Sequence, residues 1–179
     1  RFWLCLANSA LYLLVTPVLI GLSLGAAMVV HAALPFAKGL RLLLFLPVVT
    51  PTIVAAVAWT AVLREEGGLA NAVLGWMHLE PIAWLTQRPW TLISAMLVTL
   101  WKGFGFYMMV FLSGLVAVPR ELKEAASLDG AGRLGIFRHV VMPAIWPVVS
   151  LVFVISSISA LKVFEELYVT VKGTPIEHQ

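Results

Sequence analysis

The sequence predicts an all-α membrane protein, a polytopic bundle of transmembrane helices. Of its 179 residues, 61% are hydrophobic and 12% are charged, and the mean hydropathy is +0.97. Soluble domains are typically about 45–50% apolar and about 25% charged, so this chain carries too little charge for a water-facing surface. Its long apolar runs favour helices, because open strands cannot span lipid and a barrel would need short alternating strands.

Four apolar segments are each long enough to cross a membrane, since a spanning helix needs about 20 residues. They are residues 2–36, 42–63, 90–118 and 140–161. Pro47 and Pro51 interrupt the second segment, and Gly103 and Gly105 are expected to break the third. We therefore expect about four spans with internal breaks. Transporters often show such breaks, and packing kinks also produce them.

The loops between these segments predict the orientation. Basic residues gather before the second and fourth segments, at Lys38, Arg41, Arg120, Lys123, Arg133 and Arg138. The loop between the second and third segments contains Arg64 and Arg88. By the positive-inside rule, residues 35–41 and 119–143 should be cytoplasmic and residues 64–89 external.

The predicted external loop has helical periodicity of its own. Its apolar residues recur at helical spacing, at Leu69, Val73, Leu74 and Met77. It also carries Trp76, Trp84 and Trp90, and tryptophan prefers the membrane interface. We expect a short helix lying along the outer membrane surface, and a plain loop is the alternative.

The stretch "VPRELKEAASLDGAGRLGIFRHVVMP" carries seven of the chain's 21 Lys, Arg, Asp and Glu residues. Pro119 can occupy the first position of a helix, which Gly130 and Gly132 would end. A second short helix should follow, and Pro143 and Pro147 would mark entry into the last span. Such a helix–turn–helix unit could dock a soluble partner, or it could be a solvated amphipathic loop.

Part of this stretch, "EAASLDGAGRLGIFRHVVMP", resembles the EAA loop of the membrane subunits of bacterial ABC importers. The matching residues are Glu124, Ala125, Ala126, Asp129, Gly130, Ala131, Val140, Met142 and Pro143. Val140 and Met142 stand where the family usually has Ile and Leu. The resemblance implies that residues 119–143 form a cytoplasmic coupling loop within one permease domain covering residues 1–179.

The similarity extends over nearly the whole chain and is greatest to the maltose and glycerol-3-phosphate type of carbohydrate permease. "FLPVVTPTIVAAVAW", "GGLANAVLG" and "LWKGFGFYMMVFLSGL" carry it, as does "VFEELYVTVKGTP", where Thr174 replaces a family glycine. It implies the first of two paired permease subunits. It also implies a type I importer domain of six spans, of which this chain would be a fragment, in the bacterial cytoplasmic (inner) membrane.

The resemblance further implies a complex. The expected partners are a second permease subunit, two cytoplasmic ATP-binding subunits, an extracytoplasmic solute-binding protein and the lipid bilayer, with no nucleic acid. The chain lacks a Gly-x-x-x-x-Gly-Lys-Ser/Thr loop, so it should bind no ATP itself. We expect a non-catalytic subunit without a cofactor, whose partner ATPase uses ATP and magnesium.

Candidate pathway residues lie in the third and fourth segments. Ser156 and Ser159 fall in the part of the helix where the family contacts sugars, although serines often bond to their own helix. Tyr107 could stack on a sugar ring or pack inside the protein. Lys102 is a charge well inside a span, which suggests a function unless its ammonium snorkels to the interface.

Other functions fit the sequence less well. An importer for a non-sugar solute remains open, because the EAA loop contacts the ATPase and not the solute. An ion-coupled transporter would need carboxylates in mid-span. A membrane enzyme has little support, since His31, His78, His139 and His178 form no metal-binding pattern. The single Cys5 excludes an internal disulfide and a cysteine-based metal site.

Overall fold

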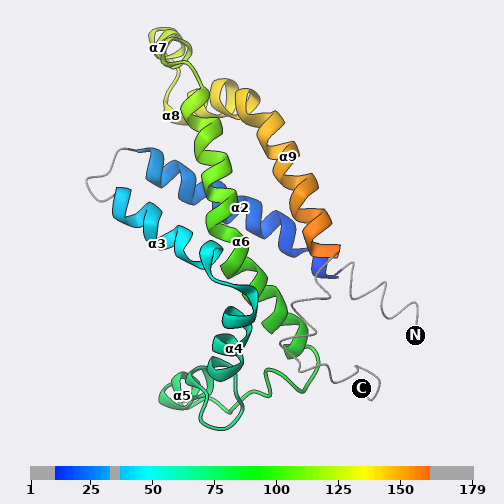
Figure 1. Ribbon diagram of the computed structural model, residues 1–179. Helices are drawn as coiled ribbons and strands as arrows, with labels where there is room; N and C mark the ends of the chain where they lie inside the picture. Colours follow the sequence, from blue (N-terminus) through cyan, green and yellow to red (C-terminus); the bar gives the residue numbers. More distant parts are fainter. Residues whose placement is uncertain (1–10, 33–36, 162–179) are drawn as a thin grey trace. The chain divides into compact units, whose positions relative to one another are not determined.

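The computed structural model describes residues 11–32 and 37–161. The secondary structure of these residues is helical, with connecting turns and no strand (Figure 1). The helices are α2 (Val15–His31), α3 (Ala37–Val49), α4 (Thr52–Val62), α5 (Leu69–Trp76), α6 (Trp90–Ala117), α7 (Arg120–Leu128), α8 (Arg133–Ile136) and α9 (Met142–Leu161), with a π-helical turn η1 (Phe137–Val141) between the last two. The resembling segment at 163–175 lies outside the described residues. The all-α prediction is confirmed.

Three stretches of helix within the described residues are long and apolar enough to span a membrane: Leu11–His31, Trp90–Ala117 and Arg133–Ala160. A fourth candidate is the pair Ala37–Val49 and Thr52–Val62, which is bent by 99° at its break. This agrees with the predicted number of about four spans.

The break between α3 and α4 has its cause in Pro51. This residue adopts φ −56° and ψ 138°, an extended conformation that precedes the first residue of α4. Proline also disfavours helical geometry in the residue before it, here Thr50. Pro47, in contrast, is accommodated inside α3. The second segment is therefore broken as its prolines predicted.

The prediction that Gly103 and Gly105 break the third segment is wrong, because α6 runs unbroken from Trp90 to Ala117. Gly105 instead permits a close helix contact. A Cβ atom on it would lie 2.0 Å from the carbonyl oxygen of Leu44, a separation that no side chain can occupy. Small residues commonly serve this purpose where membrane helices meet.

The described residues divide into two compact units. The first contains residues 11–15, 47–102 and 158–161, and the second contains residues 16–32, 37–46 and 103–157. In the first unit, Tyr12 packs with Ala95 and Ala160. The Tyr12 hydroxyl donates to the Ala95 carbonyl at 3.3 Å and is hydrogen-bonded to the Thr99 hydroxyl.

The second unit has an apolar core. Its most completely buried large side chains are Met108, Phe111, Ile145 and Val152. Gly114 brings α6 close to α9, since a Cβ atom there would lie 3.0 Å from the Val148 side chain. α6 and α9, which precede and follow the predicted coupling loop along the chain, therefore pack closely against each other.

Candidate functional site: the glycine-broken segment 119–143

The first helix of the segment is α7. Pro119 precedes it, with φ −56° and ψ 137°, and Arg120 is its first residue. Pro119 is thus the N-cap and not the first helical residue, a shift of one position from the prediction. Glu121 lies in the first turn, where the partial positive charge of the helix end favours a carboxylate.

A glycine turn ends α7. The N–H of Gly130 donates to the Ser127 carbonyl at 3.1 Å, and the N–H of Ala131 donates to the Ala126 carbonyl at 3.0 Å. This pair of bonds is a Schellman motif. It requires a left-handed residue at Gly130, whose φ is +83°. The predicted helix stop is confirmed at this glycine, while Gly132 has φ −69° and begins the next helix.

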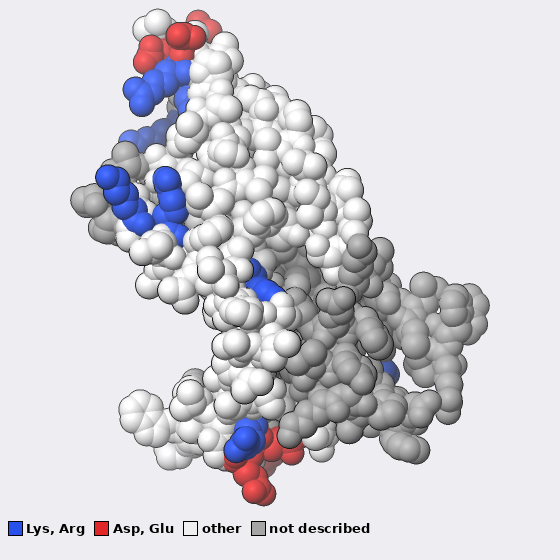
Figure 2. Space-filling model, in the orientation of Figure 1, with Lys and Arg blue, Asp and Glu red and all other residues white. Residues whose placement is uncertain are grey.

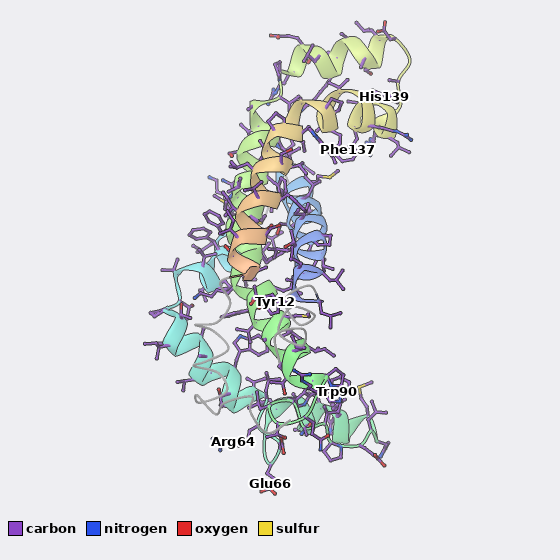
Figure 3. The ribbon with its side chains drawn as sticks, turned by 90° about the vertical axis from the view of Figure 1, so that its right-hand side faces the viewer. Tyr12, Arg64, Glu66, Trp90, Phe137 and His139 are labelled. Atoms are coloured by element: carbon purple, nitrogen blue, oxygen red, sulfur yellow. The ribbon has the colours of Figure 1, made fainter. Side chains whose placement is uncertain are left out.

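The chain then runs as one continuous helix into the last span. α8 passes through η1 into α9 without a loop, so Pro143 does not mark the start of a separate helix. A proline ring clashes with the carbonyl four residues earlier, here that of His139, which lies within η1. The wider π turn gives this ring room. Figure 3 shows Phe137 and His139 on this turn, beside α7.

The segment is compact because α7 contacts both α8 and η1. Glu124, Ala125, Asp129, Gly130 and Pro143 are exposed, whereas Ala126 and Ala131 are half-buried. The structure therefore presents most of the predicted coupling residues on an accessible surface. In the second unit, Figure 2 shows acidic and basic side chains gathered over α7, whereas α9 carries no charged residue and its surface is uncharged.

Two leucines beside the turn were missed by the sequence analysis. Leu128 is 89% exposed and Leu134 is 78% exposed, one on each side of Gly130. Large exposed apolar side chains at a helix turn commonly mark an interaction surface. Their signal in the sequence was an isolated leucine on either side of a glycine turn within a charged stretch.

The predicted cytoplasmic segments lie in the same unit. The second unit contains the described residues 37–41 of the first predicted cytoplasmic segment as well as segment 119–143. The described part of the predicted external loop, 64–89, belongs to the first unit.

The three candidate pathway residues differ in their surroundings. Ser156 is 3% exposed and donates to the Phe153 carbonyl at 3.2 Å. Tyr107 is 6% exposed, and its ring packs edge-on against Phe106 at 5.2 Å. Ser159 is exposed. Ser156 and Tyr107 belong to the core of the second unit, and Ser159 belongs to the first unit.

Lys102, the charge inside the third span, is paired within the first unit. Its ammonium donates to the hydroxyl of Thr52, the first residue of α4. Next to it, Trp101 packs edge-on against Trp59 at 5.7 Å. The lysine therefore lies at the break between α3 and α4, where the interrupted backbone needs polar partners.

Several long apolar helices, one of them broken, joined by a compact helix–turn–helix segment, define a multi-pass membrane protein of the transporter class. Residues 17–175 match the family described as "Binding-protein-dependent transport system inner membrane component". The chain belongs to this family, and it is accordingly a multi-pass component of the inner membrane.

Relatives in this family are permease proteins of sugar transport systems. The chain is 30% identical to the trehalose/maltose transport system permease protein MalF of Thermococcus litoralis, over 86% of this chain and 52% of that protein. It is 30% identical to the sulfoquinovosyl glycerol transport system permease protein SmoG of Agrobacterium fabrum, over 97% of this chain and 57% of that protein. The resemblance to carbohydrate permeases is confirmed.

The fold is shared with a solved transporter. A chain in the crystal structure of a bacterial alginate ABC transporter, in complex with an alginate pentasaccharide-bound periplasmic protein, matches with a TM-score of 0.80. The identity is 24%, and the match covers 94% of this chain and 60% of that chain. This protein thus spans somewhat more than half the length of the relatives that it matches.

Proposed function

We propose that this chain belongs to the membrane subunit of an ATP-driven ABC importer. It would contribute to the translocation pathway for a sugar or related solute, and segment 119–143 would couple it to a cytoplasmic ATPase. The observation that carries the proposal is the exposed helix–turn–helix at Gly130 in a member of the binding-protein-dependent family.

The coupling role follows from what the segment offers a partner. Glu124 and Asp129 are exposed carboxylates, and Ala125 leaves room beside them for a close approach. Leu128 and Leu134 add apolar area that has no cover within the second unit. An ATPase shifts a permease between two states only if it binds them with different affinity, so the contact must be strong enough to transmit this difference.

The proposed importer contains other subunits that this chain would work with. ATP and magnesium would be bound by the ATPase subunits, because this chain has no phosphate-binding loop. A solute-binding protein would deliver the solute, as the family description suggests. A second permease subunit would complete the pathway. Within this complex the chain would be non-catalytic.

The solute class is proposed from the relatives. Their names place them in sugar transport systems, and a sugar needs hydroxyl partners and aromatic rings along its path. Ser156, Ser159 and Tyr107 are the residues proposed to supply them. Because Ser156 and Tyr107 are buried in this conformation, they would have to become accessible when the permease opens.

Transport by the reconstituted complex tests this function. The full-length subunit, its permease partner, the ATPase and the binding protein would be assembled in vesicles with a panel of labelled oligosaccharides. We expect ATP-dependent uptake of at least one sugar that the binding protein retains. Uptake of a non-sugar solute alone would replace the sugar assignment, and uptake driven by an ion gradient without ATP would contradict the importer.

A further inference from the structure

The predicted external segment 64–89 contains an exposed apolar face on α5. Its members follow the helical repeat and are all exposed: Leu69, Ala72, Val73, Trp76 and Met77. We call this set the α5 stripe. Trp76 is 92% exposed, and α5 carries no charge at any position. In the first unit, Figure 2 shows an uncharged surface over α5, with charged side chains gathered beside it.

The opposite side of α5 is fixed by its own loop through Asn71. The Asn71 amide donates to the carbonyls of Glu65 and Ile82, each at 3.0 Å. Its carbonyl oxygen accepts from the Ile82 N–H at 3.1 Å and from the Trp84 indole at 2.8 Å. All the hydrogen-bonding capacity of this side chain is used. The stripe is therefore held outward by a preorganised scaffold.

The end of the loop next to α6 adds to this scaffold. Trp84 packs edge-on against Trp90 at 5.3 Å, and its carbonyl accepts from Ser94 at 2.9 Å. These contacts join the loop to the start of α6. Of the three tryptophans predicted to be interfacial, Trp84 and Trp90 thus hold the loop together, and Trp76 alone is left fully exposed.

The C-terminus of α5 leaves few backbone groups open. The N–H of Leu79 donates to the Leu74 carbonyl at 2.9 Å, and the N–H of His78 donates to the Gly75 carbonyl at 3.1 Å. This Schellman motif places His78 in the left-handed region, with φ 57°. A helix with capped carbonyls can lie in a region of low polarity at little cost, because unsatisfied backbone groups are expensive there.

We propose that the α5 stripe lies in the outer leaflet of the membrane, at the level of the lipid headgroups and upper acyl chains. α5 contacts α4, and α4 exposes Ile53, Val54 and Val57 in a segment that belongs to a candidate span. The stripe thus continues the apolar surface of a spanning element. Arg64, Glu65 and Glu66 lie between the two helices along the chain, a suitable place for charges at the headgroups, and Figure 3 labels Arg64 and Glu66.

Lipid fits the stripe better than a soluble protein does. Protein interfaces carry polar groups around their apolar centre, at about one hydrogen bond per 100–200 Å², whereas the indole N–H of Trp76 is the one polar side-chain group in the stripe. Tryptophan is enriched at the membrane interface. The α5 stripe would then anchor the external loop and fix the position at which α4 leaves the membrane.

Spin labels on α5 test this placement. The full-length permease, in its complete transporter and with Cys5 replaced by Ser, would be reconstituted in vesicles of phosphatidylethanolamine and phosphatidylglycerol. Nitroxides would be attached at Val73→Cys and Trp76→Cys. Gly75→Cys is the matched control, because Gly75 is exposed, has free space for a side chain and lies about 100° around the helix from Trp76 and about 160° from Val73.

We expect the ratio of oxygen collisions to nickel-chelate collisions to be several-fold higher at Val73 and Trp76 than at Gly75, because oxygen concentrates in lipid. Equal ratios at the three sites, or higher nickel accessibility at the stripe, would overturn the proposal. Low collision rates with both reagents that rise when the permease is separated from its partners would overturn it too, in favour of a protein contact. The measurement needs neither ATP nor solute, so it stands apart from the proposed transport function.

Discussion

Two connecting segments of this permease, 64–89 and 119–143, are built from similar parts but differ in the contacts that hold them together. Each holds a short helix, a cluster of charges and a glycine-containing turn. In the external segment, side chains bind one another and the backbone, with Asn71 at the centre. In segment 119–143, the side-chain hydrogen bond described is that of His139 with the Gly135 carbonyl at 3.1 Å, and the charged side chains face outward.

This difference suggests a division of labour. A loop whose polar groups bind each other is rigid and needs no partner to complete it. A segment with fewer such side-chain bonds, which leaves most of its charges and two leucines exposed, has interactions available for another protein. The predicted external loop is thus held by its own contacts, and segment 119–143 has the exposed surface that its proposed docking role requires.

The largest effect is expected from Asn71→Ala. The change removes four hydrogen bonds, each worth about 1 kcal/mol, so the local free energy of opening of the loop should fall by about 2–4 kcal/mol. Hydrogen exchange of amides in 64–89 should accelerate by tenfold or more. Ser127→Ala on α7 is the control, since Ser127 is exposed and its loss should change exchange in 119–143 little. Unchanged exchange in the external loop would show that Asn71 does not hold it.

A smaller effect, on binding, is expected from Leu128→Ser and Leu134→Ser. Burying one such side chain against the ATPase contributes about 1–2 kcal/mol, so each change should weaken ATPase binding by roughly tenfold. The fold of the permease should persist because both side chains are exposed. Leu79→Ser, at a site in the predicted external loop that is 53% exposed, should leave the affinity unchanged. Affinity measured by titration of the detergent-solubilised permease with ATPase would decide this, and equal losses at the three sites would contradict the comparison.

The smallest effect is a gain in stability from His78→Gly. The left-handed φ of 57° at His78 is unfavourable for a residue with a Cβ atom, and glycine is preferred at this position of a Schellman motif. We expect the external loop to be stabilised by about 0.5–1 kcal/mol, after allowing for the greater freedom of glycine in the unfolded chain. Slower hydrogen exchange at Leu79 would show it, and faster exchange would mean that the imidazole contributes more than the backbone costs.

The features predicted correctly from the sequence are those that local chemistry decides. Long uncharged runs specify spanning helices, Pro51 specifies a break, and Gly130 specifies a left-handed turn. Each of these follows from the residue itself and its immediate neighbours along the chain. The helix α7 and the turn at Gly130 in segment 119–143 were predicted for the same reason, since both are local.

The features that were missed depend on distant neighbours. The low helix propensity of glycine predicted a break at Gly105. In the structure, Gly105 instead allows close contact with the backbone of Leu44, some sixty residues away in the sequence. The hydrogen bond of Lys102 to Thr52 and the four bonds of Asn71 likewise join separate segments. Exposure of Leu128 and Leu134 was missed because an isolated leucine in a charged helix is usually assigned to its buried face.

The central claim is that segment 119–143 couples the permease to an ATPase through the turn at Gly130, and two valine substitutions test it most directly. Gly130 and Gly132 both have free space around them, but φ is +83° at the first and −69° at the second. Gly130→Val should therefore cost about 1–3 kcal/mol of backbone strain, while Gly132→Val should cost little. The measurement is ATP hydrolysis by the reconstituted complex, stimulated by the solute-loaded binding protein. We predict a loss of tenfold or more for Gly130→Val and near-normal stimulation for Gly132→Val, with normal membrane insertion of both. Full stimulation in the Gly130→Val complex would show that this segment is a solvated loop and would contradict the account.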